Sequence, residues 1–164
     1  MSDYDVEMLS LDNLIADSLT DFVEVARLAN AEFPIDKVHV QVMTKPHRPP
    51  SQLPSGKMAV YAFFWSDRVL KVGKVGPKSS ARYCSQHYNP ESAQSNLAQS
   101  ILTNQAALGF PPIDPNSAGE WIKTNPDRVN LVLPVELGLP LLALLESFLH
   151  VRWKPAFEGK TGVE

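Results

Sequence analysis

Apolar residues recur at three- and four-residue steps near the start of the chain, and this spacing predicts an amphipathic helix over residues 12–33. Asp12 is the expected N-cap, and Pro34 is expected to end the helix because proline cannot continue it. The apolar stripe consists of Ile15, Leu19, Phe22, Ala26, Ala29 and Phe33.

The pattern then changes to strict alternation, which predicts a strand over residues 37–44. Four prolines in residues 45–56 indicate a loop or tether. Two apolar runs within residues 58–74 flank the polar stretch Ser66-Asp67-Arg68, and this arrangement predicts a β-hairpin with a three-residue loop.

The second half of the chain alternates between helical and extended patterns. We expect a short helix near Arg82, a second helical stretch over residues 92–107, a loop over 109–119, a strand over about 128–135 and a helix within 138–155. This order predicts an α/β (α+β) fold, in which helices flank a small central mixed or antiparallel sheet and the N-terminus adds a helical extension.

Charge is distributed unevenly between two parts of the chain. Residues 1–36 contain nine acidic residues and one arginine, whereas residues 37–90 contain nine lysines and arginines and one aspartate. Such asymmetry is typical of a polyanion-binding face with an acidic appendage, although a solvated surface explains it equally well. We expect an N-terminal segment of helix, strand and proline-rich linker over residues 1–50, and the main domain over 51–164.

The remaining composition indicates a globular protein of the cytoplasm. No apolar run approaches the length of a membrane span, so we expect no membrane partner. The acidic N-terminus lacks the basic region of a secretory signal. Cys84 is the one cysteine, so it has no partner for an internal disulfide, which suits a reducing compartment.

The hairpin carries polar residues where packing would favour valine or isoleucine. A three-residue loop places Phe63 opposite Lys71 and Tyr61 opposite Gly73, so Tyr61 and Lys71 become diagonal neighbours on one face. Gly73 then leaves room over the tyrosine ring. A loop with an even number of residues would place Tyr61 and Lys71 on opposite faces. Taken alone, a tyrosine in a strand is more often a core residue.

A carboxylate within the C-terminal apolar helix is the other unusual feature. Glu146 stands in "LLALLESFLH", where Leu142, Ala143 and Leu149 flank it on its own helix face. A buried carboxylate is costly unless it is paired, hydrogen-bonded or bound to a metal, but a position at the rim of the helix facing water explains it as well.

These residues resemble the motifs of the GIY-YIG nuclease superfamily over about residues 58–158. Ala59-Val60-Tyr61 stands where "GIY" belongs, and Lys71-Val72-Gly73 stands where "YIG" belongs. Arg82 and then His87 follow as the family's arginine and histidine do. Glu146 opens an E-x-x-L element that is followed by Lys154-Pro155.

The resemblance implies a metal-dependent endonuclease that hydrolyses phosphodiester bonds in DNA, with RNA also a possible substrate. Tyr61 would be the general base, Lys71 would lower its pKa, and Arg82 would stabilise the phosphate. Glu146 would bind the metal, Mg²⁺ or Mn²⁺. The residues expected to contact nucleic acid are Lys74, Lys78, His87 and Lys154.

Two departures from the family pattern leave alternatives open. Lysine replaces the first tyrosine of "YIG" at Lys71, as in some members similar to restriction endonucleases, and Glu158 replaces the terminal asparagine. The chain would then be an active nuclease of restriction or phage defence, or an inactive nucleic-acid-binding module or partner-regulated subunit with the same basic face. In a third interpretation, the acidic N-terminal helix binds a protein partner or forms a homodimer.

Overall fold

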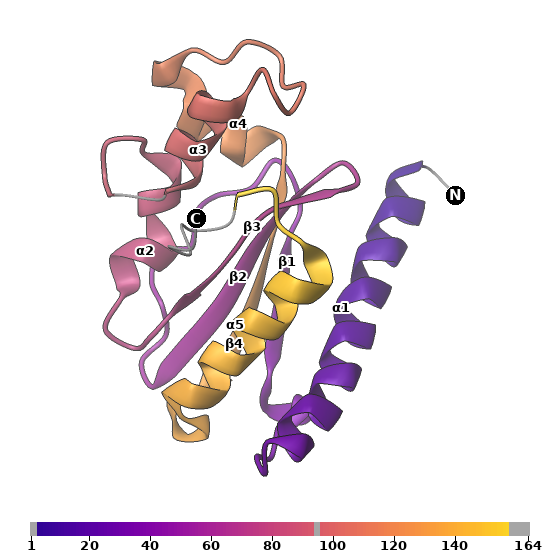
Figure 1. The fold of residues 1–164 in the computed structure, drawn as a ribbon. Helices are drawn as coiled ribbons and strands as arrows, with labels where there is room; N and C mark the ends of the chain where they lie inside the picture. The colour runs from indigo at the N-terminus through magenta and orange to yellow at the C-terminus, as the bar shows by residue number, and fades with distance from the viewer. Residues whose placement is uncertain (1–2, 94–95, 158–164) are drawn as a thin grey trace, which may run out of the picture.

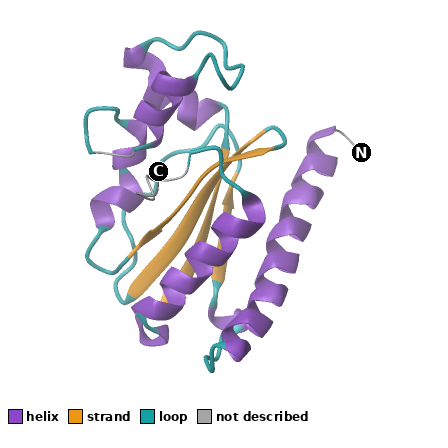
Figure 2. Ribbon diagram, in the orientation of Figure 1, coloured by secondary structure: helices purple, strands orange, loops and turns teal. Residues whose placement is uncertain are grey.

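A four-stranded antiparallel sheet lies at the centre of the computed structural model, which describes residues 3–93 and 96–157. Its strand order is β1-β4-β2-β3, and the strands are β1 (His39–Met43), β2 (Lys57–Trp65), β3 (Arg68–Val75) and β4 (Asp127–Pro134). Helices flank this sheet (Figure 2). The predicted α+β class with an N-terminal helix is therefore confirmed.

One face of the sheet is covered by the two longest helices, α1 (Asp3–Leu28) and α5 (Leu139–Trp153), which lie side by side (Figure 1). Alternate residues of the central strands point into this layer. The buried residues that form this core include Phe22, Val60, Ala62, Leu131 and Leu145. Pro140 lies in the first turn of α5, as the sequence predicts.

The opposite face is covered by three shorter helices, α2 (Ser80–Cys84), α3 (Leu97–Asn104) and α4 (Ala118–Thr124). Tyr61 and Phe63 of β2 point into this second core, together with Ile101 and Ile122 of the covering helices. Because both faces of the sheet are covered, polar side chains on this face are buried as well.

The first helix differs from its predicted bounds at both ends. It begins at Asp3, so Asp12 lies inside it and is no cap, and it ends at Leu28, six residues before Pro34. Asn30 adopts a left-handed conformation with φ 55°, and the Ala31 amide donates to the Ala26 carbonyl at 2.9 Å. Asparagine tolerates this conformation, so it stops the helix before the proline is reached.

The second half of the chain contains one helix that the sequence pattern missed. Residues 118–124 form α4, whereas the prediction placed a loop up to residue 119 and a strand from about 128. The helix spans two turns only, which is too short for a clear periodicity. Where residues 92–107 were expected to be helical, α3 covers eight residues.

The predicted boundary near residue 50 does not separate two cores. β1 pairs with β4 along its full length, from His39 opposite Val132 to Met43 opposite Arg128. The α1 residues Ile15, Leu19 and Phe22 belong to the same apolar core as α5. Residues 45–56 form the expected loop between β1 and β2. None of the helices in the described part of the chain combines the length and hydropathy needed to span a membrane.

The hairpin reaches the predicted pairing by a different route. Its turn has two residues, Ser66 and Asp67, so Trp65 pairs with Arg68 instead of Val69. An even-numbered turn alone would have put Tyr61 and Lys71 on opposite faces. However, Phe64 pairs with Val69 and Phe63 with Lys71, which leaves Leu70 as the extra residue of a β-bulge. The bulge restores the parity, so Tyr61 lies opposite Gly73 as predicted.

Candidate functional site

Tyr61 and Lys71 lie on the same face of neighbouring strands, and both side chains are buried. The Tyr61 ring passes over Gly73. A Cβ atom at residue 73 would lie within 2.6 Å of Tyr61 Cζ, closer than side chains approach one another. A glycine is therefore required here for a close approach, not for an unusual backbone conformation. We call Tyr61, Lys71, Arg82, His87 and Glu146 the Tyr61 cluster.

His87 contacts the Tyr61 hydroxyl through a short hydrogen bond, with 2.6 Å between Nε2 and Oη. Its other nitrogen, Nδ1, accepts a hydrogen bond from the Leu97 backbone amide at 3.2 Å. Burial, together with the charges of Lys71, Arg128 and Arg82, lowers the pKa of His87 to about 2, so the ring is neutral. Because Nδ1 is an acceptor, this hydrogen-bond network assigns the ring proton to Nε2, which therefore donates to Tyr61. His87 cannot take the proton of Tyr61 in this state, but it stabilises a phenolate.

This position corrects the role predicted for His87. The side chain is 1% exposed, so it lies beneath the surface and cannot contact a nucleic acid directly. The residue occupies the 3₁₀ turn Gln86–Tyr88 that follows α2, and this turn directs the ring inward. Its partner is Tyr61 instead of a phosphate.

Lys71 takes part in none of the ion pairs among the described residues, so its ammonium group has no carboxylate partner there. Burial lowers its pKa to about 8, the charge of Arg82 acts in the same direction, and Glu146 opposes both. A lysine with such a pKa changes its charge close to neutral pH. The ammonium group is therefore available to an anion that enters the site.

Arg82 is the exposed member of the Tyr61 cluster. It lies in the single turn of α2, and its positive charge acts on Tyr61, Lys71 and His87. A guanidinium that faces solvent on one side and a buried tyrosine on the other can bind a phosphate at the entrance of the site.

Glu146 reaches the cluster from α5, on the other side of the sheet edge formed by β3. Its side chain is 17% exposed, which corresponds to the rim position considered from the sequence, and it forms an ion pair with Lys74. Lys74 was predicted to contact nucleic acid, and the structure shows that its ammonium neutralises this carboxylate. The charge of Glu146 also acts on Tyr61 and Lys71.

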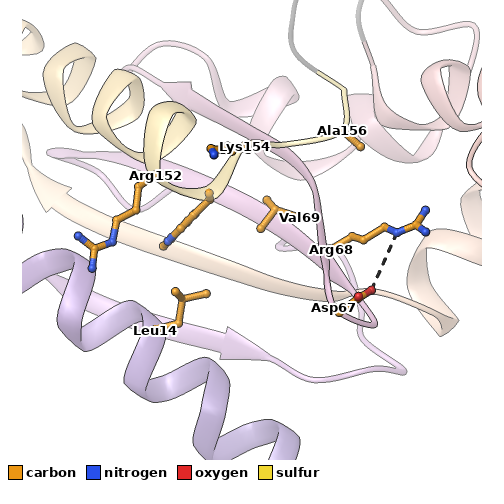
Figure 3. Close-up of a pocket in the computed structure, with 8 residues that line it drawn as sticks. Leu14, Asp67, Arg68, Val69, Arg152, Lys154 and Ala156 are labelled. Carbon is orange, nitrogen blue, oxygen red and sulfur yellow. Dashed lines mark ion pairs between the residues drawn. The ribbon is translucent and has the colours of Figure 1, made fainter.

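Two further predicted contacts with nucleic acid lie outside the cluster. Lys78 is exposed in the loop between β3 and α2. Lys154 ends α5 in a left-handed conformation and lines a hollow of about 390 Å³ at the hairpin end of β3. Figure 3 shows that Arg152 and Arg68 also line this hollow, with Arg68 turned toward Asp67. This hollow is basic, but none of the cluster residues lines it.

Arg128 is a residue of the site region that sequence reasoning missed. It is fully buried on β4, and its Cζ lies 5.5 Å from the centroid of the Tyr61 ring. The sequence does contain a pattern that points to Arg128. Arg128 and Asn130 alternate with Val129 and Leu131, so one face of a central strand is polar. From the sequence alone this face would be assigned to solvent, but helices cover it.

The ionisation of Tyr61 reflects opposing influences. Burial raises the pKa of the Tyr61 hydroxyl, and this is the largest effect. The charges of Arg82 and Arg128 lower the pKa, whereas Glu146 raises it. A phenolate would therefore depend on the cations around the ring and on the hydrogen bond from His87.

A divalent cation would have one carboxylate ligand in this cluster. Groups of three or more His, Cys, Asp or Glu side chains that could hold a metal are absent from the described residues. Mg²⁺ commonly binds through one or two carboxylates, with waters and substrate phosphates as the other ligands, so Glu146 alone fits this mode. Glu158, the other predicted carboxylate, lies outside the described residues.

Comparisons of the chain with protein-family models, with curated proteins and with solved structures give no match. The resemblance to GIY-YIG nucleases therefore rests on the sequence motifs.

Proposed function

We propose that the protein is a metal-dependent endonuclease that hydrolyses phosphodiester bonds in DNA. One observation carries this proposal. Five chain elements bring a tyrosine, a lysine, an arginine, a histidine and a carboxylate to one edge of the sheet, in the order and spacing that resemble GIY-YIG nucleases. The pairing of Tyr61 with Gly73 supports it further, since it gives a packing reason for the glycine.

Each residue has a chemical task in this proposal. The exposed Arg82 binds the non-bridging oxygens of the scissile phosphate, and Lys71 adds a second positive charge beneath it. Tyr61, as a phenolate stabilised by the His87 N–H, accepts the proton of the attacking water. Glu146 would hold the divalent cation, which when bound supplies positive charge for the leaving 3′ oxygen.

The buried position of Tyr61 adds a requirement. Its hydroxyl is not exposed, so water reaches it only after a change at the entrance of the site. Arg82 faces solvent there, and we infer that its engagement of a phosphate opens the path. Lys78, which is exposed nearby in the chain, would bind a flanking phosphate.

The test is cleavage of a supercoiled plasmid with Mg²⁺ or with EDTA. The substitutions Tyr61→Phe, Arg82→Ala and Glu146→Ala should each lower the nicking rate by about 10² or more, because each removes a group that acts in the transition state. Circular dichroism should show the native fold in all three. Glu136→Ala is the matched control, since Glu136 is an exposed glutamate just before α5 and should retain wild-type cleavage.

Two results would overturn the proposal. Unchanged cleavage in all three variants would mean that another site performs the reaction. Binding of the plasmid by the wild-type protein without any product, in Mg²⁺ or Mn²⁺, would favour the inactive binding module. An RNA strand of the same sequence, tested in parallel, identifies the preferred nucleic acid.

A further inference from the structure

Arg128 is a buried cation without a matching anion. It is 0% exposed, and none of the ion pairs among the described residues includes it. Three of its five N–H groups donate to neutral acceptors: Nε donates to Asn130 Oδ1 at 2.9 Å, Nη1 to Tyr88 Oη at 3.0 Å and Nη2 to the Tyr83 carbonyl at 2.6 Å. Burial of an unpaired charge is energetically costly, so its position needs an explanation.

Aromatic rings surround the guanidinium. Its Cζ atom lies 5.3 Å from the ring centroid of Phe63, 4.9 Å from that of Tyr83 and 5.9 Å from that of Tyr88, in addition to the Tyr61 ring at 5.5 Å. The negative faces of such rings attract a cation, which partly offsets the cost of burial. This attraction increases when a tyrosine ionises, because the phenolate charge spreads into its ring. The cage is therefore most favourable when one of its tyrosines is a phenolate.

Tyr61 is the tyrosine of this cage on which further positive charges converge. The groups that act on it are His87 from the turn after α2, Arg82 from α2, Arg128 from β4 and Glu146 from α5. Lys71 of β3 lies diagonally beside it on the same face of the sheet. His87 is neutral and donates to the hydroxyl, and the Glu146 carboxylate is shared with Lys74. The surroundings thus hold more positive than negative charge. Because Arg128 is fully buried, a group of the protein itself can compensate its charge.

We propose that Arg128 is a positioning residue for Tyr61, which holds the ring from behind and favours the phenolate that accepts the proton of the attacking water. That Tyr61 accepts the proton of the attacking water rests on the proposed nuclease function. The effect of Arg128 on the ionisation of Tyr61 is independent of that function, so the two can be tested separately. This role also explains why Arg128, Asn130 and Tyr88 form one hydrogen-bonded group below the ring.

The experiment follows the titration of Tyr61 by NMR of protein labelled with ¹³C at the tyrosine ζ carbon. Tyr61→Phe assigns the resonance among the four tyrosines. Arg128→Gln should move the midpoint of the Tyr61 titration to higher pH by about one unit or more. Arg128→Lys keeps the charge and should restore part of this shift. Arg27→Gln is the control, because it removes an exposed arginine of α1 that pairs with Glu24 and leaves the guanidinium of Arg128 in place.

A second variant covers the case in which Arg128→Gln does not fold. Asn130→Asp keeps the acceptor for Arg128 Nε and places a carboxylate beside the guanidinium, so it should also raise the midpoint of Tyr61. An unchanged midpoint in the variants that fold would show that Arg128 has a packing role only and would overturn the inference. A wild-type Tyr61 that stays a phenol until the protein unfolds would overturn it as well.

Cleavage assays then distinguish this inference from the proposed function. For an active nuclease, Arg128→Gln should shift the pH dependence of the nicking rate to higher pH by the same amount as the titration, with plasmid affinity unchanged. A shifted titration in a protein that cleaves no nucleic acid would leave the role of Arg128 in place and reject the nuclease assignment. A nicking profile that stays in place while the Tyr61 midpoint moves would reject Tyr61 as the base.

Discussion

Lys71 is a buried cation whose charge opposes folding. Its pKa of about 8 lies below the usual 10.5 because burial disfavours the ammonium form. The unfolded chain therefore binds this proton more tightly than the folded protein does. The cost of the charge is fully present below pH 8, shrinks as the pH rises from 8 to 10.5, and vanishes above that range.

Lys71→Met should therefore stabilise the protein while it impairs the proposed chemistry. A shift of this size corresponds to a gain of up to about 3 kcal/mol in the free energy of unfolding at pH 7. Urea unfolding at pH 7 and at pH 10 measures it, and the gain should be much smaller at pH 10. Lys78→Met, at an exposed position, should change the stability little. A gain of equal size at both pH values would contradict the assignment of the cost to the charge.

At the scale of residues, the sequence predicts the unusual side chains better than their surroundings. Tyr61, Lys71 and Glu146 could be singled out because they conflict with the apolar pattern around them. His87 was singled out only through the resemblance and was expected at the surface, and Arg128 was missed. The burial of both depends on helices packed from elsewhere in the chain. Whether a polar residue faces solvent or a covered interior is a tertiary property that local pattern does not contain.

At the scale of elements, the hairpin depends on the space above Gly73. Gly73→Ala should displace the Tyr61 ring, since a Cβ atom would overlap Cζ, and overpacking of this kind costs about 1–3 kcal/mol. Thermal unfolding should show this loss, and plasmid nicking should fall with it. Gly76→Ala is the matched control, because its Cβ would meet Leu139 Cδ2 at an ordinary 3.6 Å. Equal stability of the two variants would mean that Tyr61 can move without cost.

The same hairpin shows why element details resist prediction. The sequence pattern indicated both strands, and their pairing was correct at Phe63 and Tyr61, on the side away from the turn, but the turn was wrong by one residue. A bulge at Leu70 compensates for that residue. Bulges depend on how a strand fits its neighbours on both sides, and here the Phe157 amide donates to the Leu70 carbonyl from the segment after α5.

At the scale of the whole molecule, α1 is part of the core. Trp153 Nε1 of α5 donates to Ser18 Oγ at 3.0 Å, and Arg152 forms an ion pair with Asp21. The acidic residues of α1 remain a predicted surface for a partner or a second copy. Removal of residues 1–36 is a poor test of that surface, because it would also expose the apolar face of α5.

Substitutions in α1 separate its structural role from an interaction role. Phe22→Ala should lower the free energy of unfolding by about 3–5 kcal/mol, because Phe22 is fully buried and packs edge-on against Phe33 at a centroid distance of 4.8 Å. Val23→Ala, at the neighbouring position, should cost much less, because its side chain is 38% exposed. Urea unfolding of both variants measures the difference. Equal and small losses would mean that α1 is dispensable for the core and is free to act as an arm.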